Sequence, residues 1–146
     1  MTANKDASIL SNGGYYNTAL HVWGKSQAEF NGKTSITVQN GVDTARAVYV
    51  YDDYDGTTRA EFNDDLTIST AGSNATYLYG IDVRAGGKVD VTKGLIMNDN
   101  NNITWSLFAM GNDSKIDINS SASGEVQVVG SVGGYDLSLI HISEPT

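Results

Sequence analysis

Apolar and polar residues alternate over short stretches of this chain, and the same stretches recur along it. The most recognisable one is a triplet of an apolar, an acidic and an apolar residue. It occurs at residues 28–30, 60–62, 89–91 and 116–118. Alternation with a period of two places one row of side chains inside and the other outside a sheet. Each triplet therefore predicts a short strand whose acidic residue points outward.

Two further stretches accompany each triplet, and each contains a pair of apolar residues. The pairs that precede the triplets are Leu20 and Val22, Val48 and Val50, Ile81 and Val83, and Phe108 and Met110. The pairs that follow are Ile36 and Val38, Leu66 and Ile68, Leu95 and Met97, and Val126 and Val128. The repeating unit is thus three short strands separated by Gly, Asn, Asp, Ser and Thr. A unit this small cannot bury its own apolar face, so successive units must stack to form a core.

Three strands per unit favour a solenoid over a propeller, whose blades have four strands. In a solenoid each strand pairs in parallel with its equivalent one coil away, at about 4.8 Å. No proline occurs before Pro145, which agrees because proline would remove a hydrogen-bond donor from a central strand. The prediction is an all-β chain of about four coils. Their expected bounds are 15–43, 44–74, 75–102 and 103–132, after a poorly defined lead-in over 1–14.

The last ten residues, LSLIHISEPT at 137–146, break all of these patterns. The codons CTG TCT CTT ATA CAC ATC TCC GAG CCC ACG encode them residue for residue. That string resembles the transposase end and adapter used to prepare sequencing libraries. We therefore predict that this segment is a non-native, adapter-derived tail and that the natural sequence is cut near Asp136. A natural C-terminal strand is the alternative.

Composition narrows the classes of protein that fit. The chain is 40% hydrophobic and 18% charged, and it has no apolar run near the ~20 residues of a spanning helix. Its net charge of −8 repels phosphate backbones and disfavours nucleic acid as a partner. The absence of cysteine removes thiol nucleophiles, cysteine-based metal sites and disulfides.

Irregular units such as ALHVWGKSQAEFNGKTSITV and GIDVRAGGKVDVTKGLIM resemble the passenger regions of bacterial autotransporters, the surface proteins of type V secretion. The resemblance covers about residues 15–132 and rests on repeat length, Gly/Asn/Asp turns, acidity and the lack of cysteine. It implies a right-handed parallel β-helix of pectate-lyase-like fold, displayed at the cell surface through a C-terminal outer-membrane barrel that this segment lacks. The implied function is a non-enzymatic stalk and adhesin that contacts a protein or glycan of a host or neighbouring cell.

Two alternatives stay open: a fragment of a pectate-lyase-like, polysaccharide-degrading enzyme, and a phage or surface-layer fibre. We expect no catalytic residues, because His21 is the only histidine outside the tail and no sequence feature selects partners for it. Carboxylates form one outward column, which we expect to be screened by Arg59, Lys88 and Lys115. The column contains Glu29, Glu61, Asp90 and Asp117.

One turn is a candidate calcium site, and no other cofactor is expected. Asp52, Asp53 and Asp55 crowd this turn. A helix-loop-helix calcium loop does not fit, since Tyr51 and Phe62 would then occupy its first and twelfth positions. A looser calcium clamp and an ordinary solvated turn are both compatible with the pattern.

Aromatic residues offer a candidate binding surface, because flat rings stack on sugars and anchor protein interfaces. The candidates are Tyr49, Tyr51, Tyr54, Tyr77 and Tyr79, with Trp23 and Trp105 also expected on the outside. Aromatic residues are also ordinary strand formers, which is the competing interpretation.

Overall fold

The computed structural model describes residues 1–98 and 103–144, and every regular element within them is a β-strand. Residues 99–102, where the third repeat was expected to end, lie outside the described residues, as do the last two residues of the predicted tail. The strands are β1 (Thr2–Ala3), β2 (Ala7–Asn12), β3 (Tyr16–Trp23), β4 (Gln27–Phe30), β5 (Thr34–Gln39), β6 (Thr44–Tyr51), β7 (Arg59–Phe62), β8 (Leu66–Gly72), β9 (Tyr77–Arg84), β10 (Lys88–Val91), β11 (Leu95–Asn98), β12 (Trp105–Met110), β13 (Lys115–Ile118), β14 (Val126–Gln127), β15 (Val132–Tyr135) and β16 (Leu139–Ile142).

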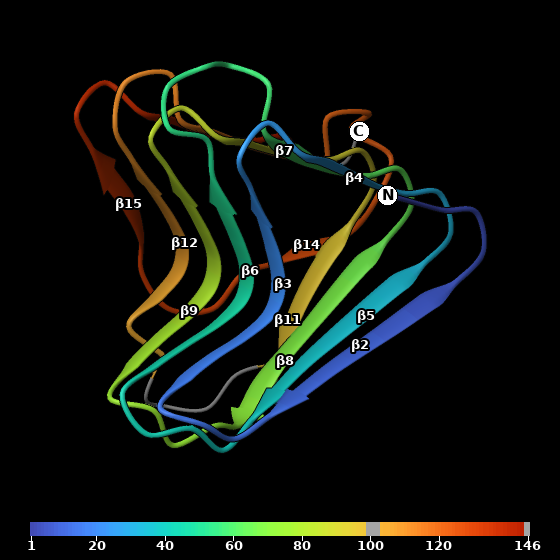
Figure 1. Ribbon diagram of the computed structural model, residues 1–146. Coiled ribbons are helices and arrows are strands. Elements are labelled where there is room, and N and C mark those ends of the chain that lie inside the picture. The colour runs from blue at the N-terminus through green and yellow to red at the C-terminus, as the bar shows by residue number, and fades with distance from the viewer. Residues whose placement is uncertain (99–102, 145–146) are drawn as a thin grey trace.

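The strands form three parallel sheets around a common interior (Figure 1). Sheet A has the order β1-β4-β7-β10-β13-β16, sheet B the order β14-β11-β8-β5-β2, and sheet C the order β15-β12-β9-β6-β3. Each strand pairs in parallel with its equivalents in the adjacent coils, so the chain is an all-β parallel β-helix, as the repeats predicted. The described residues form about five coils rather than four, because partial coils precede and follow the four complete repeats.

The first of these partial coils corrects the prediction for residues 1–14. This segment was expected to be a poorly defined lead-in, but it contains β1 and β2. Ile9 of β2 pairs with Ile36 of β5, and both side chains contribute to the core. The repeat was not visible here because β1 is two residues long and its acidic slot holds Thr2, which pairs with Glu29.

The predicted tail forms the last strand of sheet A. In β16, Ile140 pairs with Ile116 and Ile142 with Ile118. Alternating apolar residues pair with any open strand edge, so this docking follows from the pattern of the segment. Its origin in adapter sequence stays a prediction.

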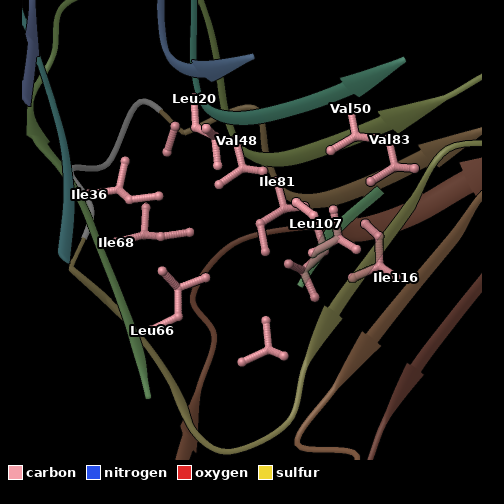
Figure 2. Packing of buried hydrophobic residues seen from close by; sticks show 14 of the residues in the cluster. Leu20, Ile36, Val48, Val50, Leu66, Ile68, Ile81, Val83, Leu107 and Ile116 are labelled. Carbon is pink, nitrogen blue, oxygen red and sulfur yellow. The ribbon is translucent and has the colours of Figure 1, made fainter. Parts of the chain in front are cut away.

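The core consists of columns of apolar side chains that point inward from all three sheets (Figure 2). Leu20, Val48 and Ile81 stack in register on sheet C, and Ile36 and Ile68 do so on sheet B. On sheet A the rings of Phe30 and Phe62 stack with centroids 5.0 Å apart. Columns of this kind are what the alternation predicted for the first three repeats.

The first strand of the fourth repeat, β12, is shifted by one residue from its prediction. Phe108 and Met110 were expected to point inward, but Leu107 pairs with Ile81 and Ala109 with Val83. A one-residue shift exchanges the two faces of a strand, so Phe108 lies on the outside. The prediction was wrong because it placed the larger apolar residues Phe108 and Met110 in the core in preference to Ala109. The Phe108 ring instead packs against other aromatic rings on the outer face.

A bend in sheet C gives the molecule a concave outer surface. Figure 1 shows the strands of this sheet bowing toward the interior midway along their length. At the bend the paired register skips one residue per strand, and every skipped residue is small. These residues are Ala19, Ala47, Gly80 and Ser106. In β6 and β9 the skipped residue and its successor are both buried, so the alternation changes phase there.

Candidate functional site

The concave outer face of sheet C carries a group of aromatic and charged side chains, which we call the concave patch. The register stacks its central row one coil above another, from β3 to β12. That row consists of His21, Tyr49, Asp82 and Phe108. Beside it lie Arg46, Tyr79 and Trp105 on one side, and Trp23, Tyr51, Arg84 and Tyr135 on the other.

A buried ion cluster forms the polar centre of the concave patch. The Asp82 side chain is fully buried and accepts a 2.8 Å hydrogen bond from Nε of Arg46 and a 2.9 Å hydrogen bond from Nε of Arg84. Burial by itself would lower the pKa of Arg84, but the hydrogen bond and charge of Asp82 outweigh it and raise the pKa. Two cations therefore share one anion, and the cluster keeps one positive charge.

Aromatic rings hold both guanidinium groups in place. The Cζ atom of Arg46 lies 4.2 Å from the ring centroid of Tyr49 and 5.4 Å from that of Tyr79. The Cζ atom of Arg84 lies 5.3 Å from the centroid of Phe108. Cation–π contacts at these distances stabilise a guanidinium, more so where water is partly excluded. The arginines are thus fixed on two sides, by a carboxylate and by rings.

The open end of the concave patch is a shallow depression of about 340 Å³, lined by His21, Trp23, Tyr49 and Tyr51. His21 stacks on Tyr49 with centroids 4.8 Å apart, and Trp23 is 63% exposed. Burial, and secondarily the charge of Arg46, lower the pKa of His21, so this ring is neutral at pH 7. Burial also raises the pKa of Tyr49. The depression therefore presents uncharged flat rings beside a positive centre.

The closed end is a packed group of rings around Phe108, which is only 5% exposed. Trp105, Tyr79 and Tyr135 contact its ring at centroid distances of 5.2, 5.9 and 5.8 Å. Gly133 leaves room for this packing, because a Cβ atom there would lie 2.8 Å from the Trp105 ring. The outward position of Phe108 is therefore not a solvent-exposed one.

The structure brings together only part of the predicted aromatic surface. Tyr49, Tyr51 and Tyr79 belong to the concave patch. Tyr54 lies in the turn after β6, and its hydroxyl lies close to Gly111. A Cβ atom added at Gly111 would be 2.8 Å from that hydroxyl. Tyr77 is exposed at the start of β9, and among the described residues no ring contact joins it to the patch.

The charged members of the patch were not predicted, although the sequence contains a signal for Asp82. Asp82 follows Ile81 as Tyr49 follows Val48 and His21 follows Leu20, so register alone aligns these outward positions. Arg46 was hidden for a different reason. Strict alternation backward from Val48 would point it inward, and the phase change at Ala47 turns it outward.

The calcium candidate has a structural role in its turn. Asp52 is fully buried, and its carboxylate accepts hydrogen bonds from the backbone N–H groups of Gly56, Thr57 and Thr58. Burial raises the pKa of Asp52, but these hydrogen bonds outweigh it and hold the pKa well below its usual range. A cation at Asp52 would have to displace N–H donors.

The other two aspartates of this turn do not complete a metal site. Asp53 is exposed at a positive φ of 63°, and Asp55 accepts hydrogen bonds from the backbone N–H and the hydroxyl of Thr57. Within the described ranges, no group of three or more His, Asp or Glu side chains is placed to hold a metal. Calcium binding stays a prediction with a direct test.

The acidic column predicted on the outer face of sheet A is confirmed in register. Glu29 pairs with Glu61, Glu61 with Asp90, and Asp90 with Asp117. Basic residues two positions earlier neutralise part of it, as Nε of Arg59 lies 2.8 Å from Glu61 and Nζ of Lys115 lies 3.8 Å from Asp117. The depression over these residues is small, about 170 Å³.

A larger groove, of about 950 Å³, follows the corner between sheets A and B. Two of its carboxylates are used by the fold: Asp6 accepts a hydrogen bond from the backbone of Lys33, and Asp65 accepts one from the backbone of Gly94, both at 2.9 Å. Its described lining residues include no aromatic ring, whereas rings and an ion cluster gather on the concave patch, so we place the candidate site on the concave patch.

Comparison of this chain with protein-family models, curated proteins and solved structures found no match. The fold and site therefore define the class on their own: an all-β parallel β-helix with an aromatic, partly charged concave face. Among the residues described, none belongs to a helix long and apolar enough to cross a membrane.

Proposed function

We propose that this chain is a segment of a bacterial autotransporter passenger, a non-enzymatic β-solenoid that is displayed at the outer membrane or secreted. Three features support this: the parallel coils of irregular length, the absence of cysteine, and the net charge of −8. Its role is adhesive, and the concave patch is the surface that contacts a glycan of a host or neighbouring cell.

The observation that carries this proposal is the gathering of aromatic rings on one concave face around a fixed ion cluster. Flat rings bury the apolar faces of sugars, and rigid rings lose little conformational entropy on binding. The central strands of the patch, β6, β9 and β12, are paired on both sides, and the edge strands β3 and β15 are each paired along one side, so the surface is formed before any ligand arrives. A preformed surface fits a solenoid that presents one face to another cell.

A bead-adhesion experiment tests the proposal. Beads coated with the protein are expected to bind mammalian or bacterial cells, and enzymatic removal of surface glycans is expected to reduce the binding. The double substitution Trp23→Ala and Tyr51→Ala should lower binding at least several-fold. Tyr16→Ala is the matched control, because Tyr16 is 71% exposed on β3 but lies outside the depression.

The display part of the proposal needs a separate measurement. In the bacterium that encodes the protein, an antibody against this segment should label intact cells, and added protease should remove the label. Label only after cell lysis would contradict surface display. Equal bead binding by the wild type, the double variant and Tyr16→Ala would contradict the role of the patch.

A further inference from the structure

We infer that the concave patch binds a sugar that carries a carboxylate, with Arg46 and Arg84 binding the carboxylate and the neighbouring rings stacking on the sugar. This inference rests on the proposed adhesive function and specifies its ligand. The acidic sugar is either a terminal nonulosonic acid or a uronic acid within a chain, because both place a carboxylate on a pyranose ring.

Unused hydrogen-bond donors are the first argument. Each guanidinium carries five N–H donors in a fixed fork. Arg46 and Arg84 reach Asp82 through Nε, and among the described residues no hydrogen bond from their terminal amino groups is found. Their side chains are 17% and 23% exposed, so part of each side chain remains accessible from the outer face. A carboxylate is the acceptor that a guanidinium fork matches in geometry.

Charge is the second argument. The protein as a whole is acidic, with a net charge of −8, yet the ion cluster keeps one positive charge. Within the described residues, Asp82 is the only carboxylate that forms a salt bridge with either arginine. An anionic ligand would provide the second carboxylate, and the surrounding rings would strengthen the attraction by excluding water.

The third argument concerns what adjoins the arginines. The guanidinium of Arg46 lies on the ring of Tyr49, and Tyr49 is itself one of the residues that line the depression, with His21, Trp23 and Tyr51. A carboxylate at Arg46 would therefore place the sugar ring that carries it among flat, uncharged side chains. A free phosphate or an acidic peptide would use the arginines but not these rings. The combination favours a sugar acid.

Matched pairs of sugars provide the test, with quenching of tryptophan fluorescence or calorimetry as the readout. The first pair is sialyllactose and lactose, and the second is trigalacturonic acid and its methyl ester. We expect one acidic member to bind at least about tenfold more tightly than its neutral partner, as the loss of charge-assisted hydrogen bonds predicts. The pair that shows the difference identifies the source of the sugar acid.

Two kinds of substitution separate charge recognition from stacking. Arg84→Lys keeps a cation beside Asp82 but removes the fork, and it should reduce the preference for the acidic sugar with little effect on the neutral one. Trp23→Ala should weaken both. Arg59→Lys on sheet A is the control and should change neither, since Arg59 pairs with Glu61 on another face.

The outcomes distinguish this inference from the proposed function. Equal binding of acidic and neutral sugars by the wild type would overturn the inference and leave an adhesive surface for neutral glycans. If the protein binds neither sugars nor cells, both the inference and the proposed adhesive function are refuted. If Arg84→Lys fails to fold in a thermal melt, the comparison of sugar pairs on the wild type still decides.

Discussion

Arg46 and Asp82 are 36 residues apart in sequence, and a 2.8 Å hydrogen bond joins their side chains on the outer face of sheet C. Two features of the fold bring them together. Stacking places β6 beside β9, with Tyr49 paired to Asp82, and the phase change at Ala47 turns Arg46 toward the same face. The candidate site is therefore a product of coil-to-coil register and of the bend.

Asp82 should be the most sensitive polar position of the concave patch. Asp82→Ala leaves two largely buried arginines without a carboxylate, and we expect it to lower the free energy of unfolding by about 3 kcal/mol. Urea denaturation measures this. Asp113→Asn, in an exposed turn, is the control and should stay within about 0.5 kcal/mol of the wild type. Equal stability of the two variants would show that the ion cluster does not stabilise the fold.

Gly80 should be required for the close packing of β9 at the bend in sheet C. A Cβ atom there would lie 2.3 Å from Cε of Met97 and 2.5 Å from the backbone oxygen of Ser106. Gly80→Ala should therefore cost about 1–3 kcal/mol through overpacking. Gly72→Ala is the matched control, because its nearest neighbour is the flexible Gln39 side chain at 3.3 Å. A Gly80→Ala variant as stable as Gly72→Ala would contradict the tight packing at the bend.

Asp52 should stabilise its turn without calcium. Asp52→Ala removes the acceptor for three backbone N–H groups and should cost about 1–3 kcal/mol, whereas Asp53→Asn should be nearly neutral. Melting temperatures with calcium and with a chelator should coincide. A higher melting temperature with calcium, lost in Asp53→Asn, would instead establish the looser calcium clamp.

The lowered pKa of Asp52 also predicts an acid-sensitive turn. The stabilisation by this carboxylate is present above its ordinary pKa of 3.8 and is lost as the pH falls toward the lower folded-state value. Wild type and Asp52→Asn should therefore differ in stability at pH 6 and converge in strong acid. A difference that is independent of pH would show that the charge of Asp52 is not what stabilises the turn.

His21 should make the fold less stable in mild acid. Its pKa is lowered in the folded state, so the unfolded chain takes up a proton first as the pH falls through 6.5. The stability should therefore decline between pH 7.5 and 5.5, and His21→Gln should decline less. Thermal melts of both proteins across this range measure the difference. Parallel curves would show that His21 titrates as it does in the unfolded chain.

The enzyme alternative predicts turnover, which we do not expect. Incubation with polygalacturonate should release neither reducing ends nor an unsaturated product. The only described carboxylate of the concave patch, Asp82, is held by two arginines, and on sheet A Glu61 and Asp117 are paired with basic neighbours. If the wild type releases product from polygalacturonate and the Glu61→Gln variant does not, the enzyme alternative would replace the adhesin proposal.

The sequence predicted the solenoid well because its signals are local. The triplets fixed the inward and outward residues of sheet A, and the column from Glu29 to Asp117 followed from their spacing. Prediction failed where local patterns were ambiguous. Leu107 and Phe108 are both apolar, and residues 1–14 contain too little of the unit to show the repeat.

The sequence by itself determined the class of fold, since a period of two and a recurring unit leave stacked parallel coils as the way to bury the apolar rows. Only the tertiary structure decided which outward residues meet. Register between coils places Asp82 beside Tyr49, and the bend at small residues such as Ala47 and Gly80 turns Arg46 toward them. The physical reason is that alternation assigns a side chain to a face, whereas its neighbours on that face come from strands about 30 residues away.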